Sequence, residues 1–78
     1  MKEIYIGRYR EIGLKIAYYR KLRGITQETL AERAGLTAAF IGHLEAPNIA
    51  KALSLDTLFD IARILDVPPY KFLIFEET

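Results

Sequence analysis

Side chains that could act as catalysts or metal ligands are scarce in this sequence of 78 residues. His43 is the single histidine and there is no cysteine, so neither a thiolate nucleophile nor a His/Cys metal set can be assembled. Glu28 and Glu32 are spaced for one solvated helix face, whereas acid–base catalysis by two carboxylates requires burial or crowding. A glycine-rich phosphate loop is also missing. We therefore expect no enzyme and no catalytic, cofactor-binding or metal-binding residues.

Basic residues are concentrated at the start of the chain. Residues 1–23 contain seven lysines and arginines against two acids, whereas residues 24–78 contain four against eight, although the net charge is only +1. A basic N-terminal helix can form an electrostatic face for a polyanion. The same pattern is also typical of an ordinary solvated helix surface, so charge alone leaves both interpretations open.

The apolar pattern predicts a compact all-α fold of five short helices. Apolar residues recur at helical spacing, and glycines and prolines interrupt them between the segments. The predicted helices span residues 8–23, 27–34, 38–45, 55–66 and 69–74. Residues 4–6 and 72–75 are β-prone, so short extended segments at the termini are an alternative to helix there.

A sharp corner is expected between the second and third helices. Thr26, Thr37 and Ser54 precede predicted helices, where a hydroxyl can accept a hydrogen bond from the first free backbone amides. Gly35 can end the second helix in the left-handed conformation. Only Gly35, Leu36 and Thr37 separate the two helices, as in a DNA-binding helix-turn-helix, although any tight corner between two helices shares this spacing.

The residues around this corner resemble a known family. The run ITQETLAERAGLT, from Ile25 to Thr37, is similar to the phage-repressor (Cro/cI, XRE-type) helix-turn-helix family, and FIGHLE from Phe40 to Glu45 continues the match. The resemblance covers about residues 11–75, and it extends to flanking apolar positions and one glycine: Ile12, Gly13, Ile16, Leu55, Leu58, Ile61, Ala62, Leu65 and Val67. It implies a single lambda-repressor-like DNA-binding domain over residues 1–78, acting as a sequence-specific transcriptional regulator, most simply a repressor.

The resemblance implies that the third helix lies in the major groove of double-stranded DNA and that the second helix crosses the backbone above it. It places Ala38, Ala39, Gly42 and His43 at base-facing positions. Alanine can contact a thymine methyl group and histidine can donate to a purine edge, but two alanines and a glycine bring no polar side chain. Direct readout should therefore be limited, and DNA shape should carry much of the specificity.

The resemblance also implies contacts with the DNA backbone. Gln27 matches a position that binds a phosphate and braces the third helix, and Thr37 caps that helix where its amides can face a phosphate. Residues 46–48 read Ala-Pro-Asn in place of the Asn-Gly turn often seen in the family. Asn48 and Lys51 are the available substitutes for backbone contact, with a merely solvated loop as the alternative.

Arg20 and Glu45 correspond to family positions that form a structural ion pair between the first helix and the end of the third. Arg20 is therefore expected to hold the fold together and not to contact DNA. If the pair is partly buried, removing one partner should cost more than the pair itself contributes, because a charge is left stranded.

One predicted surface is not explained by the motif. Leu14, Tyr18 and Leu22 form a second apolar stripe on the first helix, roughly 120° around it from the residues expected to face the core. Polar residues usually occupy such a face. We hypothesise that residues 4–6 and 72–75 pack on this stripe, either within one chain or across a two-fold homodimer. A dimer would place two third helices on half-sites roughly 34 Å apart.

The remaining expectations concern location and a rival function. The N-terminal residues lack the apolar stretch of a signal peptide and no apolar run has the length of a membrane helix, so we expect a cytoplasmic protein without a membrane partner. The rival to a regulator is a protein-interaction or antitoxin-like adaptor on the same scaffold, with weak DNA binding. Ala38, Ala39 and Gly42 favour this rival, whereas Gln27 and the basic first helix oppose it.

Overall fold

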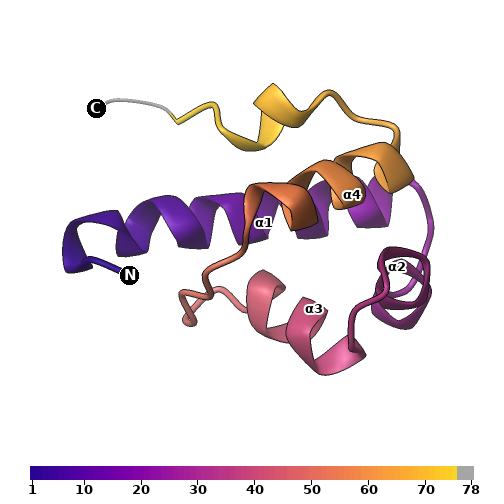
Figure 1. The fold of residues 1–78 in the computed structure, drawn as a ribbon, viewed down its shortest axis with the longest axis horizontal. Helices are drawn as coiled ribbons and strands as arrows, with labels where there is room; N and C mark the ends of the chain where they lie inside the picture. Colours follow the sequence, from indigo (N-terminus) through magenta and orange to yellow (C-terminus); the bar gives the residue numbers. More distant parts are fainter. Residues whose placement is uncertain (76–78) are drawn as a thin grey trace.

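The computed structural model describes residues 1–75, which form four α-helices and two short 3-10 helices (Figure 1). The elements follow one another along the chain without a strand in the described part. Their bounds are η1 Glu3–Tyr5, α1 Ile6–Leu22, α2 Gln27–Ala34, α3 Ala38–Glu45, α4 Leu55–Leu65 and η2 Pro69–Phe72. The prediction of an all-α fold is therefore confirmed, whereas the prediction of five α-helices is wrong.

The fifth predicted helix, over residues 69–74, is the four-residue 3-10 helix η2. Its turns are closed by hydrogen bonds from Lys71 N to Pro68 O, at 3.0 Å, and from Leu73 N to Tyr70 O, at 2.9 Å. Such i to i+3 bonds rarely continue beyond a few residues. The side chain of Phe72 is fully buried in the core, so tertiary packing determines the path of this segment. The alternative of extended segments at the termini is wrong for residues 4–6, which belong to η1 and the start of α1. At the other end, Phe72 belongs to η2, and the described residues 73–75 form neither helix nor strand.

The predicted caps are present at the three internal helices. Thr26 Oγ1 accepts a hydrogen bond from Thr29 N, Thr37 Oγ1 accepts one from Phe40 N and Ser54 Oγ accepts one from Thr57 N, at 3.0, 3.1 and 3.1 Å. Each bond satisfies an amide that the helix itself leaves free. The cap residues therefore fix where α2, α3 and α4 begin.

One hydrophobic cluster joins all four α-helices and η2. Its fully buried large side chains are Ile16, Leu30, Ile41, Ile61, Leu65 and Phe72. In Figure 1, α1 runs along the long axis with α4 against it, and α2 and α3 lie on one side. The segment that follows α4, residues 67–75, lies on the other side and is called the C-terminal segment below. The core therefore supports α3 from behind and leaves its outer side free.

Two contacts of α1 hold the other helices close. A Cβ atom at Gly13 would lie 1.7 Å from the carbonyl oxygen of Leu44, so only glycine permits α1 and α3 to cross at this distance. At the end of α1, Arg23 donates hydrogen bonds to the carbonyl oxygens of Leu65 and Asp66, at 2.7 and 3.0 Å. These carbonyls are among those that the last turn of α4 cannot pair. Both contacts join residues more than 30 positions apart, so local sequence patterns could not predict them.

The second apolar stripe of α1 is not covered by the described residues. Leu14, Tyr18 and Leu22 are 47%, 62% and 60% exposed. The hypothesis that the chain's own terminal segments pack on this stripe is therefore wrong for residues 4–6 and 72–75. Phe72 and Phe75 pack against the core side of α1 instead, where Phe72 meets Tyr19 edge to face.

None of the helices in residues 1–75 has the length and apolar character needed to cross a bilayer.

Candidate nucleic-acid interface

The corner between α2 and α3 is built by three residues. Gly35 adopts the left-handed conformation, with φ of 68°, and its amide donates to Glu32 O. Leu36 N donates to Ala31 O at 2.8 Å, so the last carbonyls of α2 are satisfied as in a Schellman motif. Thr37 then caps α3 directly. The predicted sharp corner is thus confirmed, and it fixes the direction in which α3 leaves α2.

A buried network of hydrogen bonds braces α3 against α1 and α2. Arg20 Nε donates to Glu45 Oε2 at 2.6 Å and Arg20 Nη2 donates to Glu45 Oε1 at 2.8 Å, which gives a bidentate pair. Arg20 Nη1 donates to Ile25 O at 2.8 Å, and Gln27 Nε2 donates to Glu45 Oε1 at 3.0 Å. The predicted ion pair and the bracing contact of Gln27 are therefore present.

The surroundings of this ion pair favour the charged form of Arg20. The hydrogen bond to the Glu45 carboxylate raises the pKa of Arg20, with burial opposing and the negative charges of Glu45 and Glu28 adding to the rise. Arg20 therefore remains protonated at any pH at which the protein would be studied. A permanent charge that is bound to Glu45 and Ile25 serves the fold, as expected, and is not available to DNA.

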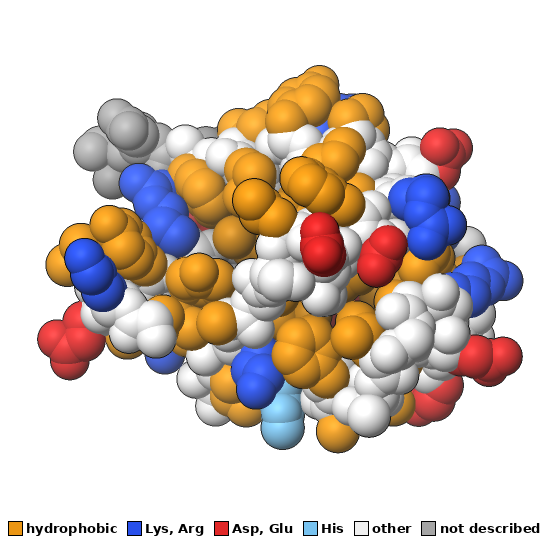
Figure 2. Space-filling model, in the orientation of Figure 1, with side chains coloured by type: hydrophobic (Ala, Val, Ile, Leu, Met, Phe, Trp, Pro, Cys, Tyr) orange, Lys and Arg blue, Asp and Glu red, His pale blue; other side chains and the backbone are white. Residues whose placement is uncertain are grey.

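The outer side of α3 carries the predicted base-facing residues. Ala38, Ala39 and His43 are exposed and Gly42 is half-buried beside Gln27. Figure 2 shows the histidine, in pale blue, at the lower edge of the molecule, on the side where Figure 1 shows α3. The four residues occupy one face because helix positions i, i+1, i+4 and i+5 lie together. The opposite face of α3 supplies Ile41 and Leu44 to the core.

The loop after α3 carries further polar groups, and one of them contacts α3. Asn48 is exposed, and its carbonyl oxygen accepts a hydrogen bond from Arg10 Nη2 at 3.4 Å. The Lys51 ammonium lies 5.5 Å from the centre of the Phe40 ring, which is on α3. Arg10 was not among the predicted site residues, since its place beside the loop depends on a contact across 38 positions. The basic character of residues 1–23 was the one available signal.

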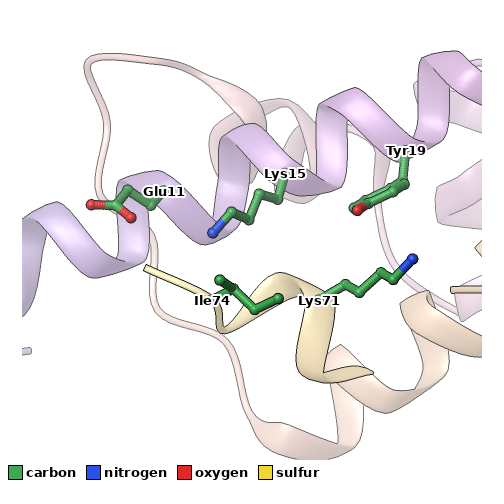
Figure 3. A pocket seen from close by; sticks show the side chains of 5 residues that line it. All are labelled: Glu11, Lys15, Tyr19, Lys71 and Ile74. Carbon is green, nitrogen blue, oxygen red and sulfur yellow. The ribbon is translucent and has the colours of Figure 1, made fainter. Parts of the chain in front are cut away.

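Among the described residues, two hollows lie between α1 and the C-terminal segment, away from α3. The larger has a volume of about 460 Å³ (Figure 3). Lys15 and Tyr19 extend into it from α1, Lys71 and Ile74 from the facing segment, and Glu11 lies at one end. Because its lining includes both lysines and a glutamate, it favours neither an anionic nor a cationic ligand. Among residues 1–75 no three His, Cys, Asp or Glu side chains are grouped so that they could hold a metal ion.

Comparison with known proteins identifies the class of protein that this arrangement represents. A profile of the helix-turn-helix family matches residues 16–72, which include all of α2, α3 and α4. The chain belongs to the helix-turn-helix family of the XRE (Cro/cI) type, a family of DNA-binding transcription regulators.

Among solved structures, the chain is similar to the N-terminal DNA binding domain of SinR from Bacillus subtilis. The TM-score is 0.75 and the identity 29%, over 88% of this chain and 99% of that chain. A comparison with curated proteins finds no significant match. The likeness to SinR therefore covers the whole of a domain and not a fragment of one.

Proposed function

We propose that residues 1–78 form a single-domain transcriptional repressor of the cytoplasm, which binds operator DNA as a homodimer and inserts α3 into the major groove. The observation that carries this proposal is the placement of α3. Its outer face is exposed, and its direction is set by the Gly35 corner and by the network of Arg20, Glu45 and Gln27. The printed description of the SinR domain as DNA binding supports the same function.

On this proposal, readout of bases by side chains is limited. The methyl groups of Ala38 and Ala39 can contact thymine methyl groups, and His43 is the polar side chain that can reach a purine edge. Gly42 has no side chain, so the backbone of α3 can approach the groove closely at this position. Recognition then depends on DNA shape and on close backbone approach as much as on hydrogen bonds to bases.

Backbone contacts come from both ends of the motif. Gln27 uses one N–H of its side-chain amide to bind Glu45 and can donate the second to a phosphate, and the first backbone amides of α3, after Thr37, can donate to a phosphate as well. Asn48 and Lys51 lie in the loop after α3, and Arg10 joins them through its bond to Asn48. Of these groups, Arg10 and Lys51 provide the positive charge that Ala38, Ala39 and Gly42 lack.

The salt dependence of DNA binding tests this proposal. Fluorescence anisotropy of a labelled duplex, selected from source-genome fragments by binding, is measured over a series of salt concentrations. Lys51→Gln should reduce the salt slope by about 0.9, the value for one lost phosphate contact. Lys71→Gln, which removes the same charge from the C-terminal segment, should leave the slope unchanged. Equal salt slopes for the wild type, Lys51→Gln and Lys71→Gln would contradict the proposal that the loop after α3 contacts DNA.

The proposed dimer contact uses the exposed apolar residues of α1 and the C-terminal segment. Leu14, Tyr18, Leu22, Leu73 and Ile74 are all at least 42% exposed, and a monomer gains nothing from exposing them. Leu22→Asp and Leu73→Asp should lower the mass in sedimentation without unfolding the domain. An unchanged monomer mass in wild type and both variants would reject the homodimer.

A protein-interaction or antitoxin-like adaptor is the second candidate. It is favoured by the absence of polar side chains at Ala38, Ala39 and Gly42, since a smooth small-residue surface also suits a protein partner. DNA binding that is weak and insensitive to His43→Ala and Lys51→Gln, together with stable capture of a protein that α3 substitutions release, would establish the adaptor in place of the repressor.

A further inference from the structure

The smaller of the two hollows near the C-terminal segment has the lining of a ligand site. It has a volume of about 280 Å³ and lies between the first turns of α1, the start of α4 and the C-terminal segment. Ile12 and Leu58, both buried in the core, form part of its wall, and Leu55, Leu73 and Phe75 contribute further carbon surface. Mostly apolar concave sites with a few polar groups are typical of small-molecule binding.

One cation is placed at this apolar hollow. Arg8 is among the lining residues, and its guanidinium lies 4.7 Å from the centre of the Phe75 ring. Stacking on an aromatic ring orients a guanidinium and leaves its N–H groups free to donate. The hydrogen bonds and ion pairs within residues 1–75 do not engage this guanidinium. A cation that is oriented by Phe75 and makes no hydrogen bond or ion pair within residues 1–75 favours a ligand with one anionic group and a compact apolar body.

We propose that this hollow binds a small monocarboxylate with an aromatic or branched apolar body, whose carboxylate pairs with Arg8. The volume of about 280 Å³ lies at the lower end of the roughly 300–1,000 Å³ that is typical of ligand pockets, so the ligand must be small, with roughly ten non-hydrogen atoms. The neighbouring hollow at Lys15 and Lys71 is larger, but its lining of both charges and its more polar surface do not select such a ligand.

The position of the hollow suggests what the ligand would do. It touches α1, α4 and the C-terminal segment, which are distant in the sequence, so a bound molecule would hold these three elements together. Leu73 belongs to both the hollow and the proposed dimer contact. Control of dimerisation by the ligand rests on the proposed function, whereas binding itself does not, and the experiment below measures binding without DNA.

The test is a titration of the full chain, labelled with nitrogen-15, followed by amide chemical shifts at constant ionic strength. The probes are phenylacetate, its neutral counterpart phenylacetamide, and acetate, up to ~10 mM because so small a ligand binds weakly. Phenylacetate should shift amides of residues 5–12, 53–58 and 73–75, and should bind more tightly than either other probe. Three outcomes would overturn the proposal: chemical-shift changes spread over the whole surface, changes centred on Lys15 and Lys71, or equal affinities for phenylacetate and phenylacetamide.

Two variants separate the roles of charge and cavity. Arg8→Gln should weaken phenylacetate binding roughly three- to fivefold, to the level of phenylacetamide, as expected for one exposed charge pair. Arg10→Gln, on the same helix but bound to Asn48 O, is the control and should have no effect. Leu73→Trp, which fills the hollow, should abolish binding of both the acid and the amide. Equal losses in the Arg8 and Arg10 variants would indicate general charge attraction and reject the site.

Discussion

Substitution of Gly42 by alanine should stabilise the domain and weaken its binding to DNA. A glycine inside a helix costs about 1 kcal/mol relative to alanine. The added Cβ would lie 3.7 Å from Gln27 Oε1, which is an ordinary van der Waals contact, so the domain has room for it. The free energy of unfolding should therefore rise by about 1 kcal/mol, which for a domain of this size raises the melting temperature by about 4–8 °C.

We expect the opposite effect on DNA binding, because Gly42 shares the outer face of α3 with Ala38, Ala39 and His43 and the added methyl group would lie there beside Gln27. If the backbone of α3 approaches the groove at Gly42, the methyl group must displace either DNA or the helix. We expect a loss of at least about tenfold in affinity, equivalent to about 1.4 kcal/mol. A gain in stability combined with a loss of affinity cannot result from unfolding, so the pair of measurements isolates the contact.

The measurements are thermal unfolding by circular dichroism and duplex binding by anisotropy at one salt concentration. Gly7→Ala is the matched control, because Gly7 is an exposed glycine of α1 with no atom within 4 Å of an added Cβ. It should not lower DNA affinity. A Gly42→Ala protein that is more stable and binds DNA as well as wild type would refute close approach at this position, and one that is less stable would refute the packing around Gln27.

Substitutions at three further places test the fold: the crossing of α1 and α3, the buried ion pair and the end of α4. Gly13→Ala should destabilise the domain by about 3 kcal/mol or more in urea unfolding, because its Cβ would overlap the carbonyl of Leu44; a loss below about 1 kcal/mol would refute the close crossing. Glu45→Ala should lower the free energy of unfolding by about 3–5 kcal/mol, because it leaves the buried charge of Arg20 without a partner. The double variant Arg20→Met with Glu45→Met removes both charges and should lose less stability than Glu45→Ala. Equal losses in the two proteins would contradict this reasoning. Asp66→Gly should raise the melting temperature, with a gain of about 1 kcal/mol, because Asp66 has a φ of 55° where glycine is unstrained; a lower melting temperature would show that the Asp66 side chain stabilises the fold.

The local signals in the sequence predicted the motif well. Thr26, Thr37 and Ser54 marked the starts of three helices, because an N-cap depends only on residues within one turn. Gly35 marked the corner for the same reason. The pair of Arg20 and Glu45 could be anticipated only from the family resemblance, since nothing local connects residues 25 positions apart.

The features that were missed depend on contacts between distant segments. The close crossing at Gly13, the bonds from Arg23 to the end of α4 and the position of Arg10 beside the loop all require the helices to be assembled first. Residues 69–74 were predicted as a helix from their prolines and apolar residues, whereas the structure has a 3-10 helix over Pro69–Phe72 with Phe72 buried in the core. The eight candidate DNA-binding residues remain predictions, and the structure adds Arg10 to them.

The sparse outer face of α3 has a consequence for how such a regulator can change over time. Ala38, Ala39 and His43 contribute nothing to the buried cluster, and the helix is held by its other side and its caps. New side chains can therefore be introduced at these three positions without rebuilding the interior. Duplicated copies of the gene could acquire separate targets while they keep one scaffold.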